Sequence, residues 1–462
     1  MTRGIVGASA YLPHRRLDRS TIAAVAGGGG GRGTRTVASY DEDTTTMGVE
    51  AARAALRPLD GTVPHTLWFS TVEPAYVDKT NATVIHAALQ LGPEVGAFDA
   101  NGSVRSAMGA LHAALSGRGS HLVVSADLRS GLAGGPDEAA FGDGAAALVI
   151  GDEDDTPVLA ELIGGGWATE EFLDRWRTPG DTRSKVWEER FGETRYLPLG
   201  QTAREDAQKT AGLVADQIDR IAIAGTHARA NAALAKKLSV GDRLVPDLAA
   251  SVGNLGAAQP ACLLTAALET AEPGQVVALV VLADGAHVLL FRTTDALAGW
   301  SPARPVAEQV AAGAPVAYGT YLRWRGVLPV EPPRRPEPAR PSASAAGRSS
   351  DWKYGFVGSA SDAGDVHLPP QPGDPTAAPM ADATGTIATF TVDRLAYSPS
   401  PPVVFAVVDF DGGGRLPVEL TDVDVDQVRI GARVEMTFRR LFTADGIHNY
   451  FWKARLVHGG EG

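Results

Sequence analysis

The sequence predicts an α/β fold of two matched halves, followed by a small all-β barrel. Three observations predict it. Apolar strand-like runs alternate with alanine-rich helical stretches over residues 1–297, one motif recurs within that region, and short β-branched and aromatic runs fill the end of the chain. Strand–helix alternation is typical of a buried, mainly parallel sheet. A chain of 462 residues is also longer than one ordinary domain.

The expected elements of the first region follow from local composition. Buried strands are expected where apolar and β-branched residues run together, at residues 63–71, 121–125, 221–224 and 276–282. Helices are expected where helix formers cluster, at residues 48–56, 82–91, 107–115, 230–238 and 257–269. The alternation of these segments indicates repeated strand–helix units.

A repeated motif divides this region into two halves, 1–152 and 153–297. Phe141-Gly-Asp-Gly-Ala is echoed by Leu282-Ala-Asp-Gly-Ala, and each copy leads directly into an apolar strand. Asp-Gly-Ala is also a common turn, so the motif alone leaves duplication and chance both open. Asp143 and Asp284, which belong to the two copies, are expected to fix turns.

The rest of the chain changes character twice. Residues 298–350 form a linker or docking segment, because the proline-rich run 331–341 and the serine-rich run 342–350 favour neither helix nor sheet. Residues 351–462 are all-β in pattern and indicate a closed barrel of the OB type. Its five strands are expected at residues 384–392, 402–410, 415–419, 433–441 and 450–456.

Composition excludes several classes of function. A net charge of −12 and a pI of about 5.4 argue against a general nucleic-acid or anionic-membrane surface. The single cysteine, Cys262, excludes an internal disulfide and a cysteine-based zinc site. No apolar run is long enough to span a bilayer, and the first residues resemble a strand rather than a signal peptide. We therefore expect a cytoplasmic protein without a membrane span.

The two halves and the Phe141-Gly-Asp-Gly-Ala-Ala-Ala motif resemble the thiolase superfamily, in its ketoacyl-ACP synthase III and HMG-CoA synthase branch. The resemblance implies a five-layer α/β/α/β/α domain of two pseudo-repeats. It also implies a homodimer whose sheets pair edge to edge, with the strand at 121–125 as the candidate edge. Counting from Asp99 along the family pattern Asp-x-x-x-x-Cys places Val104 where the family has its nucleophilic cysteine.

The same resemblance suggests the catalytic residues. His227 matches the family histidine at a strand end, and Asn254 matches the family Gly-Asn motif. A neutral imidazole and a carboxamide can polarise a thioester carbonyl and stabilise an enolate. Glu73 lies in a segment that resembles the general acid/base region of HMG-CoA synthase, although one extra residue puts its role in doubt.

Three residues around Val104 are candidates for substrate binding. The hydroxyls of Ser103 and Ser106 flank the helix start, where they could cap the helix or contact substrate. Arg105 could bind a carboxylate or phosphate, or pair with an acid of the protein itself. Cys262 is expected to be a core residue.

The end of the chain resembles the acyl-CoA-associated OB-fold domains that accompany thiolase-like proteins. Those begin with a zinc ribbon, whereas here Gly364-Asp-Val-His-Leu-Pro-Pro370 survives and the cysteine positions carry Ala360 and Ala363. The ribbon is therefore degenerate, and we expect neither a metal nor a cofactor.

Three functions are compatible with the sequence. The first is an enzyme that forms or cleaves a carbon–carbon bond of an acyl-CoA or acyl-carrier thioester by a non-covalent aldol or retro-aldol route. The second is an acyltransferase like HMG-CoA synthase with an unconventional nucleophile. The third is a catalytically silent, acyl-CoA-binding scaffold. Coenzyme A thioester enters as substrate, and the sequence leaves open whether the chain is an enzyme at all.

Overall fold

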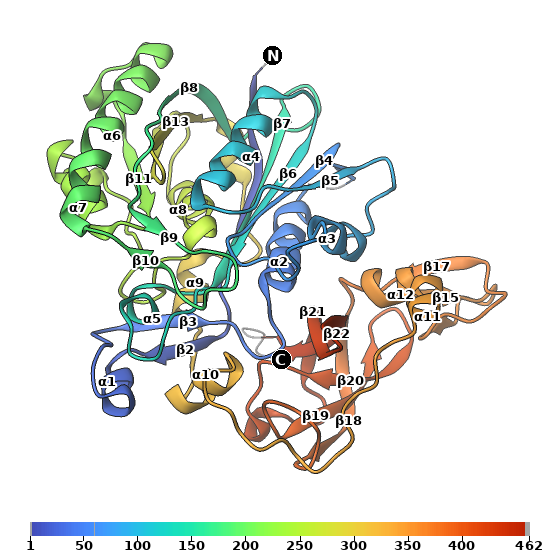
Figure 1. The fold of residues 1–462 in the computed structure, drawn as a ribbon. Coiled ribbons are helices and arrows are strands. Elements are labelled where there is room, and N and C mark those ends of the chain that lie inside the picture. The colour runs from blue at the N-terminus through green and yellow to red at the C-terminus, as the bar shows by residue number, and fades with distance from the viewer. Residues whose placement is uncertain (1, 60, 458–462) are drawn as a thin grey trace. The chain divides into compact units, whose positions relative to one another are not determined.

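The computed structural model describes residues 2–59 and 61–457, and its elements divide into two units (Figure 1). The first unit comprises Met1–Ala38, Glu50–Thr83 and Pro93–Tyr318. The second comprises Ser39–Val49, Val84–Gly92 and Gly319–Gly462. In the part of the chain described, no helix is both long and apolar enough to cross a membrane.

A nine-stranded sheet organises the first unit. Its order is β11-β12-β13-β8-β1-β7-β6-β4-β5. The strands of the first half are β1 (Arg3–Tyr11), β4 (Thr66–Ser70), β5 (Gly96–Asp99), β6 (His121–Asp127) and β7 (Gly144–Asp152). Those of the second half are β8 (Ala160–Ala168), β11 (Arg220–Gly225), β12 (Val276–Leu282) and β13 (Ala286–Thr293).

The sheet order confirms the duplication. Reading outward from the β1–β8 junction, β1, β7, β6 and β4 on one side match β8, β13, β12 and β11 on the other. Gly144 opens β7, and Gly285 immediately precedes the equivalent strand β13. The predicted edge strand is wrong, because β6 is hydrogen-bonded on both sides, to β4 and β7. The edge of the first half is β5 instead.

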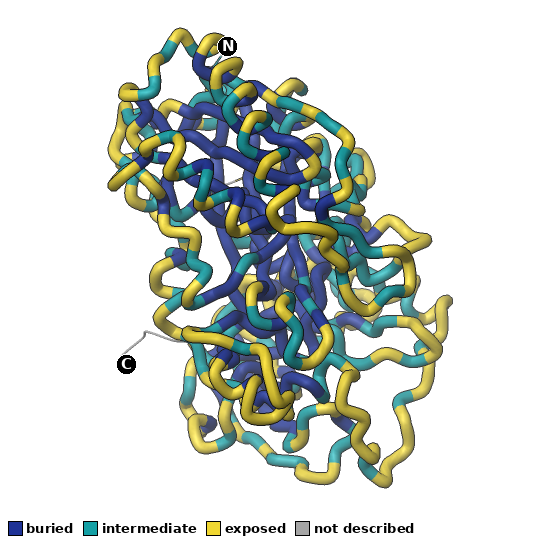
Figure 2. The backbone as a smooth tube through the Cα atoms, turned by 60° about the vertical axis from the view of Figure 1, so that its left-hand side comes forward, coloured by how far each residue is buried: buried dark blue, intermediate teal, exposed yellow. Residues whose placement is uncertain are grey.

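Two buried helices, α4 (Val104–Ser116) and α8 (Gln259–Leu268), form the centre of the first unit. Their apolar side chains share one core with β1, β7, β11 and β12. On one outer face lies α2 (Thr44–Leu56), whose Ala51 carbonyl accepts the Ser9 hydroxyl of β1 at 2.5 Å. On the other lie α6 (Glu189–Ala211) and α7 (Ala228–Lys237). Figure 2 colours the buried stretches of the backbone dark blue and the exposed stretches yellow.

The remaining elements up to residue 324 are short. The short strands are β2 (Arg15–Asp18), β3 (Thr34–Val37), β9 (Arg175–Trp176), β10 (Lys185–Val186) and β14 (Ala314–Pro315). The shorter helices are α1 (Ser20–Ala26), α3 (Ala82–Ala88), α5 (Pro136–Ala140), α9 (Val306–Ala311) and α10 (Tyr318–Trp324). The α9 and β14 segments show that regular structure continues into the predicted linker.

The second unit contains the predicted five-stranded closed barrel, in the order β18-β19-β20-β22-β21. Its strands are β18 (Thr384–Asp393), β19 (Val403–Phe410), β20 (Arg415–Leu420), β21 (Arg433–Ala444) and β22 (Ile447–Leu456). A separate small sheet precedes it, made of β15 (Val357–Ala360), β16 (Val366–His367) and β17 (Thr376–Pro379).

One prediction about the linker is wrong. The run 342–350, expected to form neither helix nor sheet, contains α11 (Ala343–Arg348), which is followed by α12 (Ser350–Gly355). Alanine has the highest helix propensity, and three of the six residues of α11 are alanine. Serine at the position before this helix favours a helix start rather than opposing it.

Candidate active site

The candidate active site lies at the amino end of helix α4, where β5 turns into helix. Gly102, with φ of +114°, and Ser103, in an extended conformation, lead from the strand into the helix, which begins at Val104. The first N–H groups of a helix have no partner within it and carry the positive end of its dipole. This start therefore favours an oxygen that bears negative charge.

A cavity of about 440 Å³ opens beside the helix start. Residues from several distant segments of the first unit line it, and the polar ones include Glu73, Ser103, Arg129, Arg177, Tyr196 and Asp284. Val104 also lines it and is only 7% exposed. The position that the resemblance assigns to the nucleophile therefore faces the cavity with an aliphatic side chain.

The two serines beside Val104 differ in their surroundings. Ser103 lines the cavity, and its side chain makes no capping hydrogen bond to α4. The Ser106 hydroxyl donates to the Asn101 carbonyl at 3.1 Å. The hydroxyl of Ser106 is thus used within its own turn, whereas that of Ser103 borders the space that a substrate could occupy.

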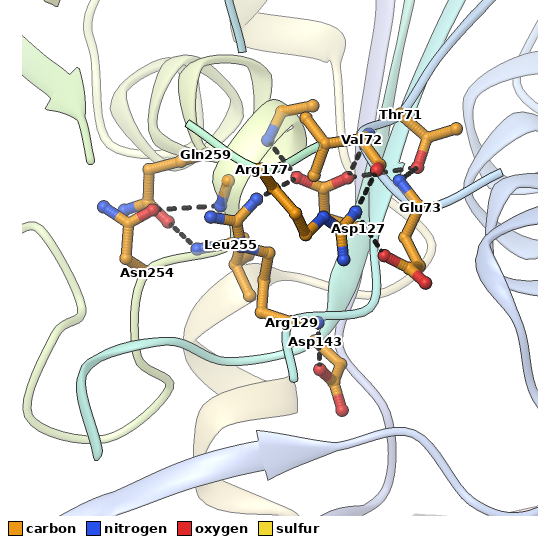
Figure 3. A network of polar contacts seen from close by, with 12 residues as sticks. Thr71, Val72, Glu73, Asp127, Arg129, Asp143, Arg177, Asn254, Leu255 and Gln259 are labelled. Atoms are coloured by element: carbon orange, nitrogen blue, oxygen red, sulfur yellow. Dashed lines mark hydrogen bonds and ion pairs between the residues drawn. The ribbon is translucent and has the colours of Figure 1, made fainter. Parts of the chain in front are cut away.

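Asp127, fully buried at the end of β6, ties together the loops around the cavity (Figure 3). Its carboxylate accepts the backbone N–H groups of Val72 at 2.8 Å and Ala257 at 2.7 Å, and the Thr71 hydroxyl at 3.1 Å. Burial raises the pKa of Asp127, and the nearby Arg129 guanidinium opposes that shift. The network holds the end of β4 against the turn that precedes α8.

The side chain of Asn254 bonds to backbone atoms. Its amide donates to the Gly225 carbonyl at 2.8 Å, and its carbonyl oxygen accepts the Gly256 N–H at 2.9 Å. Its backbone is likewise bonded, because the Gly142 N–H donates to its carbonyl at 3.0 Å. Asn254 thus connects Gly142 of the first half to Gly225 of the second half. It does not line the cavity described above.

His227 caps helix α7 and is also held by backbone atoms. Its Nδ1 accepts the Ala230 N–H at 3.1 Å, which places the proton of the neutral ring on Nε2. Nε2 lies 2.8 Å from the Glu189 carbonyl, to which it donates. The ring is buried behind the cavity wall, beside Tyr196, which does line the cavity.

Glu73 and Arg105 are both paired. Glu73 lines the cavity with its side chain 44% exposed, and its carboxylate lies 2.5 Å from the Arg177 guanidinium. Arg105 donates to the Asp284 carbonyl and, at 2.6 Å, to the Thr169 hydroxyl. The structure thus places Glu73 at the cavity and directs Arg105 towards protein groups of the second half.

Several cavity residues were not predicted from the sequence. Arg175 and Arg177 belong to the sequence Asp174-Arg-Trp-Arg177, and Tyr196 lies in α6, the next helix along the chain. Arg129 and Arg175 both stack on Phe141, at 4.3 and 4.8 Å from its ring centre. A run of alternating arginine and tryptophan after a strand was the available signal, since such residues are enriched at binding surfaces.

Cys262 is a core residue, as predicted. It is fully buried in α8, and burial raises the pKa of its thiol to about 12. A thiol in that state supplies almost no thiolate at neutral pH, and the thiolate is the nucleophilic form. The cysteine therefore does not replace the missing nucleophile.

Together these elements form a thiolase-like fold of the ketoacyl-ACP synthase III and HMG-CoA synthase type, with an OB-fold domain at the carboxyl end. The hydroxymethylglutaryl-CoA synthase of Methanothermobacter thermautotrophicus is 28% identical over 346 residues, which cover 70% of this chain and 99% of the relative. That of Pyrococcus horikoshii is 27% identical over 293 residues, covering 61% of this chain and 83% of the relative.

Solved structures share the fold at lower identity. PksG, an HMG-CoA synthase from Bacillus subtilis, has a TM-score of 0.61 at 16% identity, with coverage of 71% of this chain and 89% of that chain. FabH, the 3-oxoacyl-(acyl carrier protein) synthase III of Pseudomonas aeruginosa, has a TM-score of 0.54 at 20% identity, with coverage of 64% and 98%.

The barrel matches a separate family model. Residues 377–439 match the family described as the C-terminal OB-fold domain of ChsH2. In the small sheet before the barrel, His367 Nδ1 lies 2.7 Å from the Asp374 carboxylate, which also accepts the Ser359 hydroxyl at 2.5 Å. Ala360 pairs with Val366 and Ser359 with His367 across this sheet, and the surviving histidine contacts a carboxylate.

Proposed function

We propose that the chain is an enzyme that forms or cleaves a carbon–carbon bond of an acyl thioester without a covalent acyl-enzyme intermediate. The observation that carries the proposal is Val104, an aliphatic residue that begins α4 and lines a polar cavity. The thiolase-like fold and the similarity to hydroxymethylglutaryl-CoA synthases support an acyl thioester as the substrate class. A cavity without a thiolate at the helix start favours binding and polarising the thioester over acyl transfer to the protein.

The proposed chemistry uses polar groups around the cavity. The thioester oxygen would sit at the start of α4, where N–H groups and the helix dipole stabilise an enolate. In this proposal His227 and Asn254 support the reaction from behind the wall. His227 can exchange a proton with a substrate only after it releases the Glu189 carbonyl. Glu73 is a candidate base, since its carboxylate borders the cavity beside Arg177.

The acyl group of the substrate could be carried by coenzyme A or by an acyl-carrier protein. Coenzyme A is the carrier named for the hydroxymethylglutaryl-CoA synthases. The HMG synthase of the curacin pathway has been solved in complex with holo and acetyl donor acyl-carrier proteins. We propose a coenzyme A thioester as substrate, with an acyl-carrier thioester as the alternative.

We also propose that the protein assembles as a homodimer. Light scattering that gives a monomer at micromolar concentration would contradict the dimer.

The test uses the full-length protein with acetyl-CoA and acetoacetyl-CoA as probes. Products are followed by liquid chromatography and mass spectrometry, and the protein by intact mass. We expect a carbon–carbon product without any acyl adduct on the protein. An adduct mapped to Ser103 would support the acyltransferase function instead, because that hydroxyl borders the cavity. An adduct on Cys262 would contradict the non-covalent route.

A silent, thioester-binding scaffold is the second candidate. It is favoured by the bonding of His227 and Asn254, whose side-chain nitrogens and oxygen are all engaged by backbone atoms. Those bonds are the ones expected of residues that hold loops in place. This function would be supported if acetyl-CoA bound with neither turnover nor adduct, and if His227→Ala left that binding unchanged.

A further inference from the structure

Three ionisable side chains from separate segments of the first unit lie together behind the cavity wall. They are Tyr196 of α6, Asp174 just before β9, and His227 just before α7, and they are 3%, 5% and 7% exposed. The Tyr196 and His227 rings meet edge to face with centroids 5.8 Å apart. Only Tyr196 of the three lines the cavity. The group therefore reaches the cavity through Tyr196.

Asp174 has hydrogen-bonding capacity that the described residues do not use. Its Oδ1 is buried and has no hydrogen-bond partner there. His227 does not supply one, because its Nε2 lies 4.0 Å away and donates to the Glu189 carbonyl. A buried carboxylate without a full set of partners favours its protonated form. Burial accordingly raises the pKa of Asp174, and the interaction with His227 only partly offsets it.

Tyr196 has the complementary property of keeping its proton. Burial raises the pKa of its hydroxyl, and the carboxylates of Asp174 and Asp284 raise it further. The hydroxyl accepts a long contact from the Asp284 N–H at 3.4 Å, and the Asp174 carboxyl group lies near enough to interact with it electrostatically. A neutral phenol at a cavity wall, backed by a carboxyl group, is suited to donate a hydrogen bond into the cavity.

Gly192 shows how closely helix α6 approaches this group. A Cβ at that position would lie 2.5 Å from Asp174 Oδ1 and 2.8 Å from His227 Nε2. Glycine inside a helix lowers its stability relative to alanine. The close approach of the two ionisable side chains accounts for glycine at this position.

We propose that Tyr196 is a catalytic residue that donates its proton to the reacting oxygen of the bound thioester substrate, and that Asp174 is a positioning residue that resupplies it. As the carbonyl oxygen gains negative charge, the Tyr196 O–H bond breaks and its proton moves to that oxygen. The Asp174 carboxyl then transfers its own proton to the Tyr196 oxygen and becomes a carboxylate. Solvent reprotonates Asp174 between turnovers, so protons balance and no electrons are exchanged.

This inference rests on the proposed function, because it assigns roles within the same cavity. The titratable and charged groups around Asp174 are Tyr196 on α6, His227 before α7, Asp284 between β12 and β13, and the neighbouring Arg175. Since the resupply step needs protonated Asp174, the reaction rate should fall as pH rises through the raised pKa of that carboxyl.

The first test removes one hydroxyl at a time. Tyr196→Phe should lower kcat by about 10²–10⁴-fold, with little change in KM, because the lost proton transfer belongs to the chemical step. Tyr11→Phe is the matched control, since Tyr11 is 4% exposed in β1 and does not line the cavity. Wild-type kcat in Tyr196→Phe would overturn the inference.

The second test separates positioning from structure. Asp174→Asn should abolish the decline of kcat at high pH, whereas a merely structural role would lower kcat equally at every pH. Gly192→Ala, which crowds Asp174 and His227 without lining the cavity, should lower kcat while KM stays close to the wild-type value. An unchanged pH profile in Asp174→Asn would overturn the assignment of Asp174.

The third readout is independent of turnover. Binding of the thioether analogue of acetyl-CoA is measured by calorimetry in buffers of different ionisation enthalpy, which reports proton uptake or release. At a pH above the pKa of Asp174, we expect binding to the wild type to be accompanied by proton uptake or release. Asp174→Asn should remove this proton exchange. If the wild type has no turnover but this difference persists, the proposed function fails and the coupling of Asp174 to the cavity stands. If both are absent, the inference fails as well.

Discussion

Under the proposed function, Val104 is the residue at the start of α4 whose aliphatic side chain makes an acyl-enzyme impossible at that position. Val104→Cys should create a thiol at the start of α4 that becomes acetylated by acetyl-CoA, because a helix amino end lowers the pKa of a cysteine. Intact mass spectrometry measures the adduct. Ala107→Cys is the control, because Ala107 lies in the same helix, buried and away from the cavity. Equal labelling of both variants would contradict a special role for this helix start.

A second residue, Gly256, determines how the loop before α8 meets Asp127. Its φ of +57° lies in the left-handed region, and a Cβ there would lie 2.0 Å from Asp127 Oδ2. The left-handed conformation alone costs about 1–2 kcal/mol for a residue other than glycine. Gly256→Ala should therefore lower the free energy of unfolding by more than that, as measured by urea denaturation.

Gly109 supplies the comparison for Gly256. It lies within α4, and a Cβ there would meet nothing within 4 Å. Gly109→Ala should raise stability by about 0.5–1 kcal/mol, because alanine has the lower conformational entropy cost in a helix. If both substitutions changed stability by the same amount and sign, the close approach at Asp127 would be unimportant.

At the scale of elements, β21 and β22 of the second unit bury two cations against an acidic segment. Lys453 Nζ lies 2.9 Å from the Asp41 carboxylate and also contacts Glu419, and both Lys453 and Asp41 are fully buried. Arg439, equally buried, contacts Glu42 and lies 2.6 Å from Asp422. The segment that precedes α2 is thus held in the second unit by ion pairs.

Lys453→Met should remove the cation that pairs directly with the buried Asp41 carboxylate. Removing one partner of such a pair typically costs about 3–5 kcal/mol. The double variant with Asp41→Asn should recover part of that loss, and urea unfolding measures both. Arg415→Met is the control, because Arg415 and Asp409 pair on the same barrel with 65% and 46% of their side chains exposed. Such an exposed pair contributes about 0–1 kcal/mol.

The same pair predicts how acid affects the second unit. Burial by itself raises the pKa of Asp41, but Lys453 and Arg439 outweigh it and hold the pKa below its usual range. A depressed carboxyl pKa stabilises the fold above the unfolded value of about 3.9, and that contribution is lost as pH falls below it. Denaturation midpoints from pH 7 to pH 3 should therefore decline more steeply for the wild type than for Asp41→Asn. Parallel declines would contradict the effect.

At the scale of the whole molecule, the second unit is assembled from three stretches of chain, Ser39–Val49, Val84–Gly92 and Gly319–Gly462. A fragment of residues 351–462 would contain the barrel but lack Asp41 and Glu42, so that Lys453 would keep only Glu419 and Arg439 only Asp422 of their acidic partners described above. We expect this fragment to unfold at lower temperature by circular dichroism than the same fragment carrying Lys453→Met and Arg439→Leu. The reverse order would show that the acidic segment is dispensable.

Local sequence patterns determined most of the elements. The strand β12 was predicted at its observed bounds, because its continuous apolar run is seven residues long and rich in valine, which favours a buried strand over a helix. The barrel strands were found from alternation, with β21 and β22 extending further than expected. Helix α6 was missed, because it is strongly polar and carries Pro198 within it, and proline usually ends a helix.

For the site, the sequence by itself determined three candidate positions, Val104, Ser103 and Glu73, through short motifs that resemble those of a known family, and all three line the cavity. Only the tertiary structure decided that Tyr196 and Arg129 line the same cavity, that Asp174 lies beside His227, and that β5 rather than β6 forms the edge of the sheet. It also decided that the polar atoms of His227 and Asn254 bond to backbone groups. The physical reason is that periodicity and turn chemistry act over a few neighbouring residues. Convergence of side chains depends instead on which strands pair and how closely helices pack on them.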